Sequence, residues 1–482
     1  MRKALLWILF TAVVLQSCKS KRAEIAATRA SNRPNIVLIM TDDQGYSDAG
    51  VYGATDFETP NLDQMASEGA LLNNYYAAQA VCSASRAGIL TGCYPNRIGI
   101  HNAFMPNANK GLHPEETTLA EMLKAQGYAT AIFGKWHLGD APEFLPTRNG
   151  FDEYFGIPYS NDMWPYHPQQ GTVFNFGPLP LYENEQVIDT LSDQSNLTTQ
   201  LTERAVDFIS RKKDDPFFLY VAHPQPHVPL YVSEKFAGKS ENGLYGDVIM
   251  ELDWSVGQIL EALKANGLED NTLVVFTSDN GPWLAYGNHA GNAKPLREGK
   301  GTAWEGGQRE PFIVKYPPLI KAQSVIDTPM MGIDLLPTIA ALTESTLPPL
   351  PIDGKNMLPV LSGSTTENPH EAYFFYYEVN QLQGVRYGDW KLYFPHTYRT
   401  MAGQPQGGDG LPGDYAYIKL EEAELYHLTT DPSEQTNVAQ FHPEVVAKIE
   451  SLANEMRSKL GDALLEQVGS ESRAPGFVED SY

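Results

Sequence analysis

The chain has 482 residues, of which 42% are hydrophobic and 20% are charged, a composition typical of a globular protein and not of a disordered one. The formal net charge is −24, with 35 Lys and Arg against 59 Asp and Glu, so no general cationic field is available to hold nucleic acid. An anionic substrate must therefore be bound by a few local cations in a cleft. The length accommodates one large domain and a smaller one.

Residues 1–18 have the pattern of an export signal. Two basic residues precede an apolar stretch at residues 4–14, which is shorter than the roughly 20 residues needed to span a bilayer. The stretch ends in a segment similar to the processing site of bacterial lipoproteins, in which Cys18 would carry the lipid; ordinary signal cleavage near Ser17 is the alternative. We expect an exported protein of the periplasm or cell surface, attached to the membrane only through this lipid, with residues 19–32 as a polar tether.

Continuous apolar runs predict strands that are buried on both faces. They lie at residues 35–40, 128–133, 216–222, 272–277 and 311–316. Helical periodicity lies between them at residues 115–126, 201–211 and 246–265. This alternation predicts an α/β domain over residues 33–365, with a large, mainly parallel sheet covered by helices on both faces.

The pattern changes after residue 365. Short aromatic strands are predicted at residues 372–379, 384–387 and 390–394, and a long helix at residues 443–460. Residues 366–482 are therefore expected to form a smaller C-terminal α+β subdomain with an antiparallel sheet. The Gly- and Pro-rich segment 401–415 is predicted to be a surface loop.

Polar residues follow the predicted strands, where the ligand sites of such sheets gather. Asp42, Asp43, Asp279 and Asn280 offer hard oxygen ligands that suit Ca²⁺ or Mg²⁺ better than zinc. The alternative for the first pair alone is a helix cap with a solvated neighbour. A four-ligand zinc hydrolase is the weakest hypothesis, because no matching His and Cys set accompanies the acids.

Cys82 begins a predicted helix, and Arg86 lies one turn further along it. A thiol near a helix N-terminus and an arginine can be a reactive thiolate. The alternative is a disulfide between Cys82 and Cys93.

The cysteine segment resembles the signature of the type I, formylglycine-dependent sulfatases, Cys-x-(Pro/Ala)-x-Arg followed by Leu-Thr-Gly. Cys82, Ala84, Arg86 and residues 90–92 match it. Further blocks follow in family order at residues 34–45, 134–139, 226–229, 278–281 and 299–307, and residues 156–160 and 334–338 indicate the arylsulfatase A-like branch. The resemblance implies the three-layer α/β fold of the alkaline phosphatase-like superfamily.

The resemblance implies that Cys82 is oxidised before folding to formylglycine (3-oxoalanine), by a formylglycine-generating or anaerobic sulfatase-maturating enzyme. The hydrated aldehyde would attack sulfur and form a covalent sulfo-enzyme. Calcium, with magnesium as the alternative, would be bound by side chain 82 and by four further residues. These are Asp42, Asp43, Asp279 and Asn280.

The remaining roles are implied in the same way. Arg86 and Lys135 would stabilise the ionised hydrate, Lys300 and His227 would bind sulfate and protonate the leaving oxygen, and His137 would take up a proton as sulfate is expelled. Ser160 would orient the substrate.

Other polar residues have less specific expectations. His289 is expected to contact the substrate or to belong only to its loop, and His223 to support the site or the structure. Glu298 either contacts a substrate hydroxyl or faces solvent. Two positions depart from the common family pattern: Ala84 replaces a frequent proline, and Cys93 a frequent arginine.

The leading hypothesis is a sulfatase that acts in polysaccharide degradation on a sulfated carbohydrate, such as a glycosaminoglycan or algal polysaccharide fragment. The alternatives are a phosphodiesterase or phosphonate monoester hydrolase of the same superfamily, and a glycan-binding protein with an inactive site. The choice of sugar is expected to depend on loops 159–169 and 401–415 and on the C-terminal subdomain.

Overall fold

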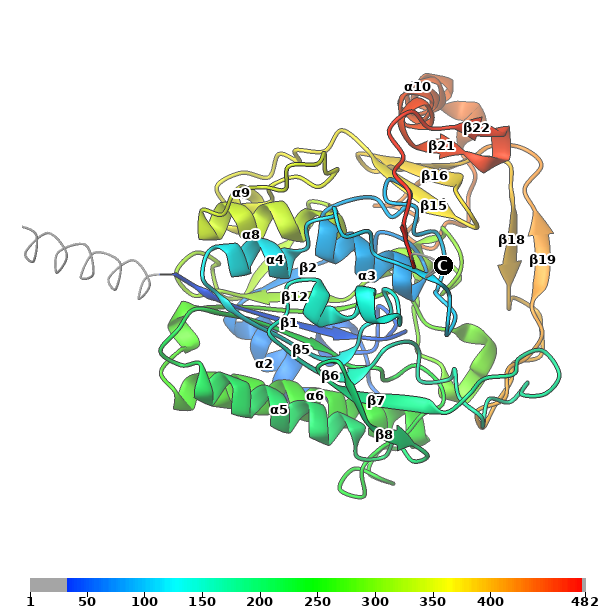
Figure 1. Ribbon diagram of the computed structural model, residues 1–482. Helices are drawn as coiled ribbons and strands as arrows, with labels where there is room; N and C mark the ends of the chain where they lie inside the picture. Colours follow the sequence, from blue (N-terminus) through cyan, green and yellow to red (C-terminus); the bar gives the residue numbers. More distant parts are fainter. Residues whose placement is uncertain (1–32, 479–482) are drawn as a thin grey trace, which may run out of the picture.

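The computed structural model describes residues 33–478, so the predicted export signal, the predicted lipidation site Cys18 and the predicted tether at residues 19–32 all lie outside the described residues (Figure 1). Among the helices of residues 33–478, none is long and apolar enough to cross a membrane.

A ten-stranded sheet forms the centre of the molecule, in the order β13-β2-β12-β10-β1-β9-β5-β6-β7-β8. Its five central strands run parallel, and four of them confirm predicted strands. These five are β10 (Thr272–Ser278), β1 (Asn35–Thr41), β9 (Phe217–Ala222), β5 (Ala129–Lys135) and β6 (Glu153–Ile157).

The sheet is mixed at its margins. The predicted strand at 311–316 is β12 (Phe312–Lys315), which runs antiparallel to β10. The other marginal strands are β2 (Ala70–Leu72), β13 (Ser324–Ile326), β7 (Leu179–Glu183) and β8 (Gln186–Leu191). The prediction of a mainly parallel sheet therefore holds for the centre, where helical crossovers connect the strands.

Helices cover both faces of the sheet (Figure 1). Alternate residues of β1 enter two separate cores: Ile36, Leu38 and Met40 enter one, and Val37 and Ile39 the other. The first core includes α3 (Cys82–Thr91), α4 (Leu119–Ala125) and α8 (Leu335–Thr343); the second includes α2 (Pro60–Glu68), α5 (Leu197–Arg211) and α6 (Gly243–Ala265). This arrangement confirms the predicted three-layer α/β fold.

One helix boundary differs from the sequence periodicity for a clear reason. The predicted helix at 115–126 begins only at Leu119, because the Thr118 hydroxyl accepts from the backbone N–H of Glu121 and the Glu121 carboxylate accepts from that of Thr118. This capping box satisfies two N–H groups that the first turn leaves free.

The C-terminal region contains the predicted antiparallel sheet. Its order is β15 (Tyr373–Tyr377), β16 (Gln381–Tyr387), β17 (Trp390–Tyr393) and β20 (Glu424–His427), and α10 (Pro443–Leu460) packs against it. A separate ribbon of β18 (Thr397–Thr400) and β19 (Ala416–Lys419) flanks the predicted loop 401–415. The short elements are α7 (Glu305–Gln308), α9 (Leu358–Leu361), β3 (Tyr75–Tyr76), β4 (Lys110–Gly111), β11 (Arg309–Glu310), β14 (Met330–Met331), β21 (Gly461–Asp462), β22 (Gln467–Val468) and β23 (Gly476–Phe477).

A buried ion pair joins the C-terminal sheet to the main domain. Lys391 of β17 donates to the carboxylate of Glu305 in α7 at 2.8 Å, and both side chains are fully buried. Tyr76 donates to the other carboxylate oxygen of Glu305 at 2.8 Å. Burial opposes ionisation of Glu305, but the attraction of Lys391 and of two nearby arginines outweighs it and lowers the pKa of Glu305 to about 2.

Replacing Lys391 with Met should destabilise the protein by about 3–5 kcal/mol, because it leaves the Glu305 charge buried without its main partner. Since the folded-state pKa of Glu305 lies below the ordinary value of 4.5, its stabilising contribution is present above pH 4.5 and is lost as the pH falls towards 2. The variant's deficit, measured by thermal or urea unfolding, should therefore shrink in acid. Lys448→Met, which removes an exposed pair with Glu371, is the control and should melt like wild type. Equal stability of Lys391→Met and wild type at pH 7 would contradict this interpretation.

Candidate active site

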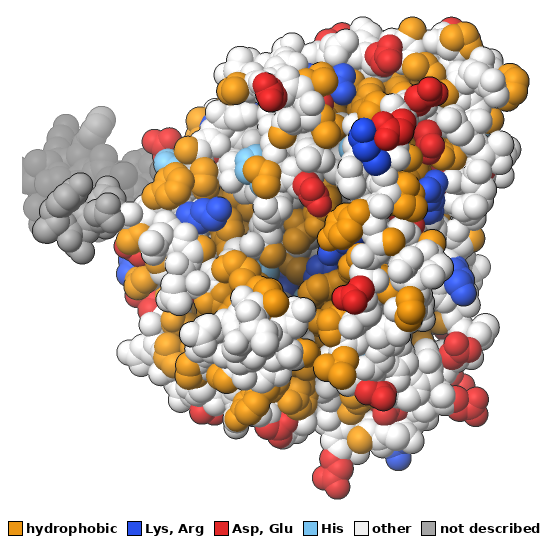
Figure 2. Space-filling view, turned by 90° about the vertical axis from the view of Figure 1, so that its right-hand side faces the viewer, with side chains coloured by type: hydrophobic (Ala, Val, Ile, Leu, Met, Phe, Trp, Pro, Cys, Tyr) orange, Lys and Arg blue, Asp and Glu red, His pale blue; other side chains and the backbone are white. Residues whose placement is uncertain are grey.

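The carboxyl ends of the parallel strands point to one face of the molecule, where Figure 2 shows a hollow with apolar walls and basic and histidine side chains at its floor. The predicted site residues that follow β1, β5, β9 and β10 meet at this end of the sheet. They are joined there by α3, which starts at Cys82, and by the segment that carries Lys300.

The acidic residues meet because β1 and β10 pair in register, Thr41 opposite Ser278. The backbone N–H of Asp43 donates to Asp279 at 3.2 Å, and the Asn280 amide donates to the Asp43 carboxylate at 2.7 Å. Asp43 has a left-handed backbone, with φ of 62°, which is uncommon outside glycine and frequent at functional sites.

Cys82 lies between the acids and a lysine. Its Sγ is 3.4 Å from Oδ1 of Asp42 and 3.5 Å from Nζ of Lys300, and the residue is only 2% exposed. Burial, together with the negative charge of Asp42, raises the pKa of the Cys82 thiol far above its usual value. The expectation of a reactive thiolate is therefore wrong for the unmodified side chain.

The disulfide alternative is also not supported, because Cys82 and Cys93 are both free and buried. Cys93 instead lies beside Thr91, Pro351 and Arg473.

Arg86 binds both acidic pairs from within α3. Its guanidinium donates to Asp279 at 3.0 Å, to Asp42 at 3.1 Å and to the carbonyl oxygen of Lys135 at 2.8 Å. The side chain is fully buried, so these three bonds replace its hydration.

Lys135 and Lys300 each bind one carboxylate. Lys135 donates to Asp42, and Lys300 lies 2.7 Å from Asp43. Burial disfavours both ammonium groups, but these carboxylates outweigh it and raise the pKa of each lysine. The preceding Gly134 has φ of 126°, and a side chain there would lie 1.9 Å from the Ala222 carbonyl, so this position of the motif requires glycine.

Two histidines and a serine complete the cluster. His137 contacts the Phe104 carbonyl oxygen through Nε2 at 2.9 Å, while its buried Nδ1 has no partner among the described residues. Burial and the charge of Lys135 hold the pKa of His137 well below its usual value, so it is a neutral base. Ser160 accepts from Lys135 at 3.2 Å, and its Oγ lies 3.5 Å from Nε2 of His227.

His227 faces the same acids and is also neutral in this state. Its Nε2 is 3.5 Å from Asp43, and its Nδ1 contacts the carbonyl oxygen of Val228. Burial, reinforced by the positive charge of Lys300, lowers the pKa of His227 to about 3.

The residues of this cluster fit a divalent cation. Asp42, Asp43, Cys82 and His227 offer ligand atoms that lie within 4.8 Å of one another, and Oδ1 of Asn280 is buried without a hydrogen-bond partner among the described residues. Unpartnered oxygens and closely spaced carboxylates are the donors that hard cations prefer. This set of four contains His227 and does not include Asp279, whose carboxylate lies 2.9 Å from the Arg86 guanidinium.

Three residues considered from the sequence lie outside this cluster. His223 bonds Ser255 of α6 at 3.1 Å and serves the structure. His289 lies beside Gly410 of loop 401–415 and is not among the residues that line the cavity beside the cluster, which is described below. Glu298 was expected to contact substrate or face solvent; instead its carboxylate accepts from Thr400 at 2.6 Å.

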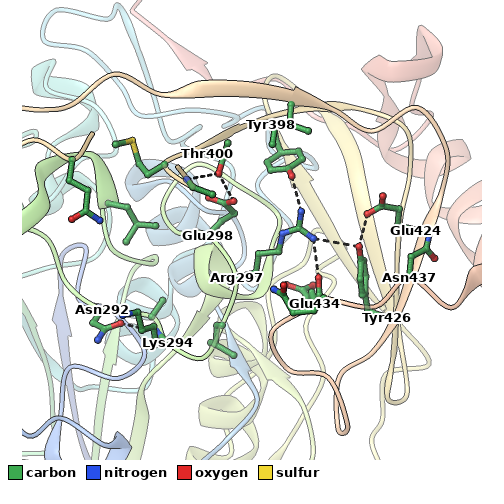
Figure 3. Close-up of a pocket in the computed structure, with 18 residues that line it drawn as sticks. Asn292, Lys294, Arg297, Glu298, Tyr398, Thr400, Glu424, Tyr426, Glu434 and Asn437 are labelled. Atoms are coloured by element: carbon green, nitrogen blue, oxygen red, sulfur yellow. Dashed lines mark hydrogen bonds between the residues drawn. The ribbon is translucent and has the colours of Figure 1, made fainter. Parts of the chain in front are cut away.

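Glu298 lines a separate cavity of about 680 Å³ between the 292–298 segment and the C-terminal region (Figure 3). Arg297 fills one side of it: its guanidinium stacks 3.6 Å from the Trp304 ring and donates to the Tyr398 hydroxyl at 2.7 Å. The cavity is lined by none of the clustered residues around Cys82.

A second cavity, of about 610 Å³, opens beside the cluster. Trp283 connects the two, since its ring lies 4.6 Å from Nζ of Lys300 and 5.5 Å from the ring of His227. Asp162, His167 and Arg399 are polar residues of this cleft that sequence reasoning did not single out, although two of them belong to the 159–169 loop that was expected to select the sugar.

Two sulfatase family profiles together match most of the described chain. The sulfatase family profile matches residues 34–345, and that of the C-terminal region of aryl-sulfatase matches residues 368–473. Human arylsulfatase A is 38% identical, covering 89% of this chain and 88% of that protein. Human N-acetylgalactosamine-6-sulfatase is 37% identical, covering 90% and 88%.

Solved structures show the same fold. The structure of Ps i-CgsB in complex with k-i-k-neocarrahexaose is 29% identical, with a TM-score of 0.73, and covers 88% of this chain and 92% of that chain. The phosphonate monoester hydrolase of Agrobacterium radiobacter, at 19% identity and a TM-score of 0.59 over 88% and 95% of the two chains, shares the fold alone. With a family match over residues 34–345 and relatives that align over most of its length, the chain belongs to the sulfatase family and is a sulfuric ester hydrolase.

Proposed function

We propose that this sulfatase removes sulfate from a sulfated carbohydrate, with side chain 82 as the nucleophile after its oxidation to formylglycine. The observation that carries the proposal is the placement of Cys82 between Asp42 and Lys300, since Lys300 lies 4.6 Å from the ring of Trp283, which lines a cleft with aromatic walls. Its relatives include human N-acetylgalactosamine-6-sulfatase and Ps i-CgsB, which was solved in complex with k-i-k-neocarrahexaose, and both support a sugar ester as the substrate.

The modified side chain supplies a hydroxyl group, as the hydrate of its aldehyde, in place of the thiol. Lys135 and Arg86 lie on the Asp42 side of position 82 and stabilise negative charge that develops there. Lys300 lies on the other side, 3.5 Å from Sγ, where its ammonium can bind a sulfate oxygen.

The two histidines have different proton roles in this proposal. Nδ1 of His137 is neutral and without a hydrogen-bond partner among the described residues, so it can accept the proton released when sulfate leaves. Nε2 of His227 lies near Lys300 and Ser160, where it can deliver a proton to the leaving sugar oxygen. Bound sulfate adds negative charge beside His227, which raises its pKa and favours the protonated form.

The proposed cation is Ca²⁺, with Mg²⁺ as the alternative. Asp42, Asp43, Asp279, Asn280 and side chain 82 would hold it. When bound, the ion would supply positive charge for sulfate oxygens.

We also propose that the chain is exported and matured in the cell by an enzyme that oxidises Cys82. The ten residues of α3 are all buried, so such an enzyme would need to reach the cysteine before the helix packs. Lipidation of Cys18 remains a prediction from the sequence, and labelling with a fatty acid in cells would test it.

The function is tested by the substrates that the mature protein cleaves. Wild type should release sulfate from 4-nitrophenyl sulfate and from sulfated monosaccharides, and Cys82→Ala should lose at least about 10³-fold in kcat/KM because the nucleophile is absent. The tryptic peptide with residue 82 should be about 18 Da lighter than the cysteine form, as expected for oxidation of the thiol to an aldehyde.

A higher kcat/KM on 4-nitrophenyl phosphate or a phosphonate ester would favour the alternative hydrolase. Binding of sulfated glycans without turnover by protein that carries the modified residue would favour the inactive glycan-binding alternative.

Removal of the cation should lower activity by more than about 10-fold and lower the melting temperature, since a ligand that binds only the folded state stabilises it. The measurement is sulfate release and thermal unfolding after treatment with a chelator, with the metal content checked by elemental analysis. Ca²⁺ should restore both at lower concentration than Mg²⁺, because Mg²⁺ demands a stricter octahedral geometry. Full activity of metal-free protein would contradict the proposal.

His227→Gln should impair poor leaving groups selectively. A sugar alkoxide needs a proton as it leaves, so kcat/KM on a sulfated monosaccharide should fall by about 10²–10⁴-fold. The loss on 4-nitrophenyl sulfate should be at least about 10-fold smaller, because nitrophenolate leaves without a proton. His223→Gln is the matched control, since this buried histidine bonds Ser255 and should leave the ratio of the two substrates as in wild type. Equal losses on both substrates in His227→Gln would exclude the proton-donor role.

A further inference from the structure

Asp162 has an unusual environment for a carboxylate. It follows Ser160 by two residues and lines the cleft beside the catalytic cluster, yet it is only 8% exposed. Its Oδ1 is buried and has no hydrogen-bond partner among residues 33–478. Buried acceptors are rarely left unpaired, because they have given up their bonds to water. A ligand in the cleft is therefore a suitable partner for this oxygen.

His167 lies opposite Asp162 in the same cleft. The backbone N–H of Gln169 donates to its Nδ1 at 3.0 Å, so in the neutral ring the proton is on Nε2. That Nε2 lies 3.9 Å from Oδ2 of Asp162, which is too long for a direct hydrogen bond. Phe174 and Phe176 pack edge-on against the ring at centroid distances of 4.8 and 5.6 Å and fix its orientation.

The pair therefore offers one fixed donor and one fixed acceptor, separated by a gap. A hydroxyl group both donates and accepts, so a hydroxyl beside the gap can bond both side chains. A second anion does not suit this pair, since it would face the Asp162 carboxylate. The neighbouring walls are aromatic, with Trp283, Tyr286 and Tyr415 among them, and such walls with few polar groups are typical of sites that orient a ring-shaped ligand.

The pair is close enough to the reaction to contact the sugar that carries the sulfate. Asp162 is at most about 7 Å along the chain from Ser160, which contacts Lys135 and His227. Trp283 lies against both His227 and Lys300 and also lines the cleft.

We propose that Asp162 and His167 bind a free hydroxyl group of the sulfated sugar ring and thereby select sulfated sugars over sulfate esters that lack this hydroxyl. The proposal rests on the proposed sulfatase function and adds to it the group that the enzyme recognises. The two residues are specificity determinants and take no part in breaking the sulfate ester.

The test compares sugar and aryl esters. Monosaccharides sulfated at each single ring position are screened, and the best substrate is compared with 4-nitrophenyl sulfate in wild type, Asp162→Ala and His167→Phe. In both variants the ratio of kcat/KM for the sugar to that for the aryl ester should fall by about 100-fold, since sites built to bind a hydroxyl group discriminate strongly. The control is Asp189→Asn, on the exposed strand β8, which should keep the wild-type ratio.

A second measurement begins with wild type alone, so its first part does not depend on the folding of any variant. Among the monodeoxy analogues of the best substrate, one should lose about 100-fold in kcat/KM with wild type. The same analogue should lose less than about 3-fold with a folded Asp162→Ala variant, because the interaction is already absent.

Three outcomes would overturn the proposal. The first is equal losses on sugar and aryl esters in Asp162→Ala, which would indicate that Asp162 acts through His227. The second is a wild-type enzyme that cleaves every monodeoxy analogue as well as the parent sugar. The third is a lack of turnover of any sulfate ester by protein that carries the modified residue 82, which would contradict the proposed function itself and is distinguishable from the other two.

Discussion

The catalytic centre depends on a balance of buried charges. Three carboxylates and three cations are buried side by side, and neither set would be stable there alone, because burying an unpaired ion costs several kcal/mol. They are Asp42, Asp43 and Asp279 against Arg86, Lys135 and Lys300. The charges also act on one another: burial, together with the negative charge of Asp42, raises the pKa of Asp279 to about 6. A divalent cation added to this set would make it positive, and the site would then attract sulfate although the whole chain carries a net charge of −24.

The fold supplies these charges from segments far apart in the sequence. The parallel register of β1 with β10 brings two acidic pairs together, and the buried helix α3 places Cys82 and Arg86 against them. The C-terminal region reaches the same edge, since Arg399 of β18 donates to the Lys300 carbonyl at 3.1 Å and loop 401–415 bonds the backbone of Ala285. The cleft beside the cluster is therefore built jointly by the main domain and the C-terminal region, and the buried pair of Glu305 and Lys391 joins these two parts.

The centre of the sheet was predictable because a strand buried on both faces leaves a continuous apolar run, as residues 35–40 show. The direction of β12 could not be predicted, since an apolar run does not reveal whether a strand is parallel or antiparallel to its neighbour. The motif residues meet in the structure, as the sequence predicts. The prediction of a thiolate at Cys82 is wrong, because the pKa of the thiol depends on burial, which the spacing of residues does not reveal. Asp162 and His167 have no periodicity or motif of their own; they became visible only through an unpartnered oxygen and a 3.9 Å gap.

The order of the segments along the chain has a consequence for the timing of the proposed oxidation of Cys82. Cys82 contacts Lys300, which is 218 residues later in the sequence. At a synthesis rate of about 5–20 residues per second, roughly 10–40 seconds pass between the appearance of the cysteine and that of the lysine. During this interval the thiol cannot be enclosed by its final neighbours. Slower synthesis or delayed folding would therefore lengthen the period in which Cys82 can be oxidised. Rapid folding would end this period and leave unmodified chains with a buried thiol.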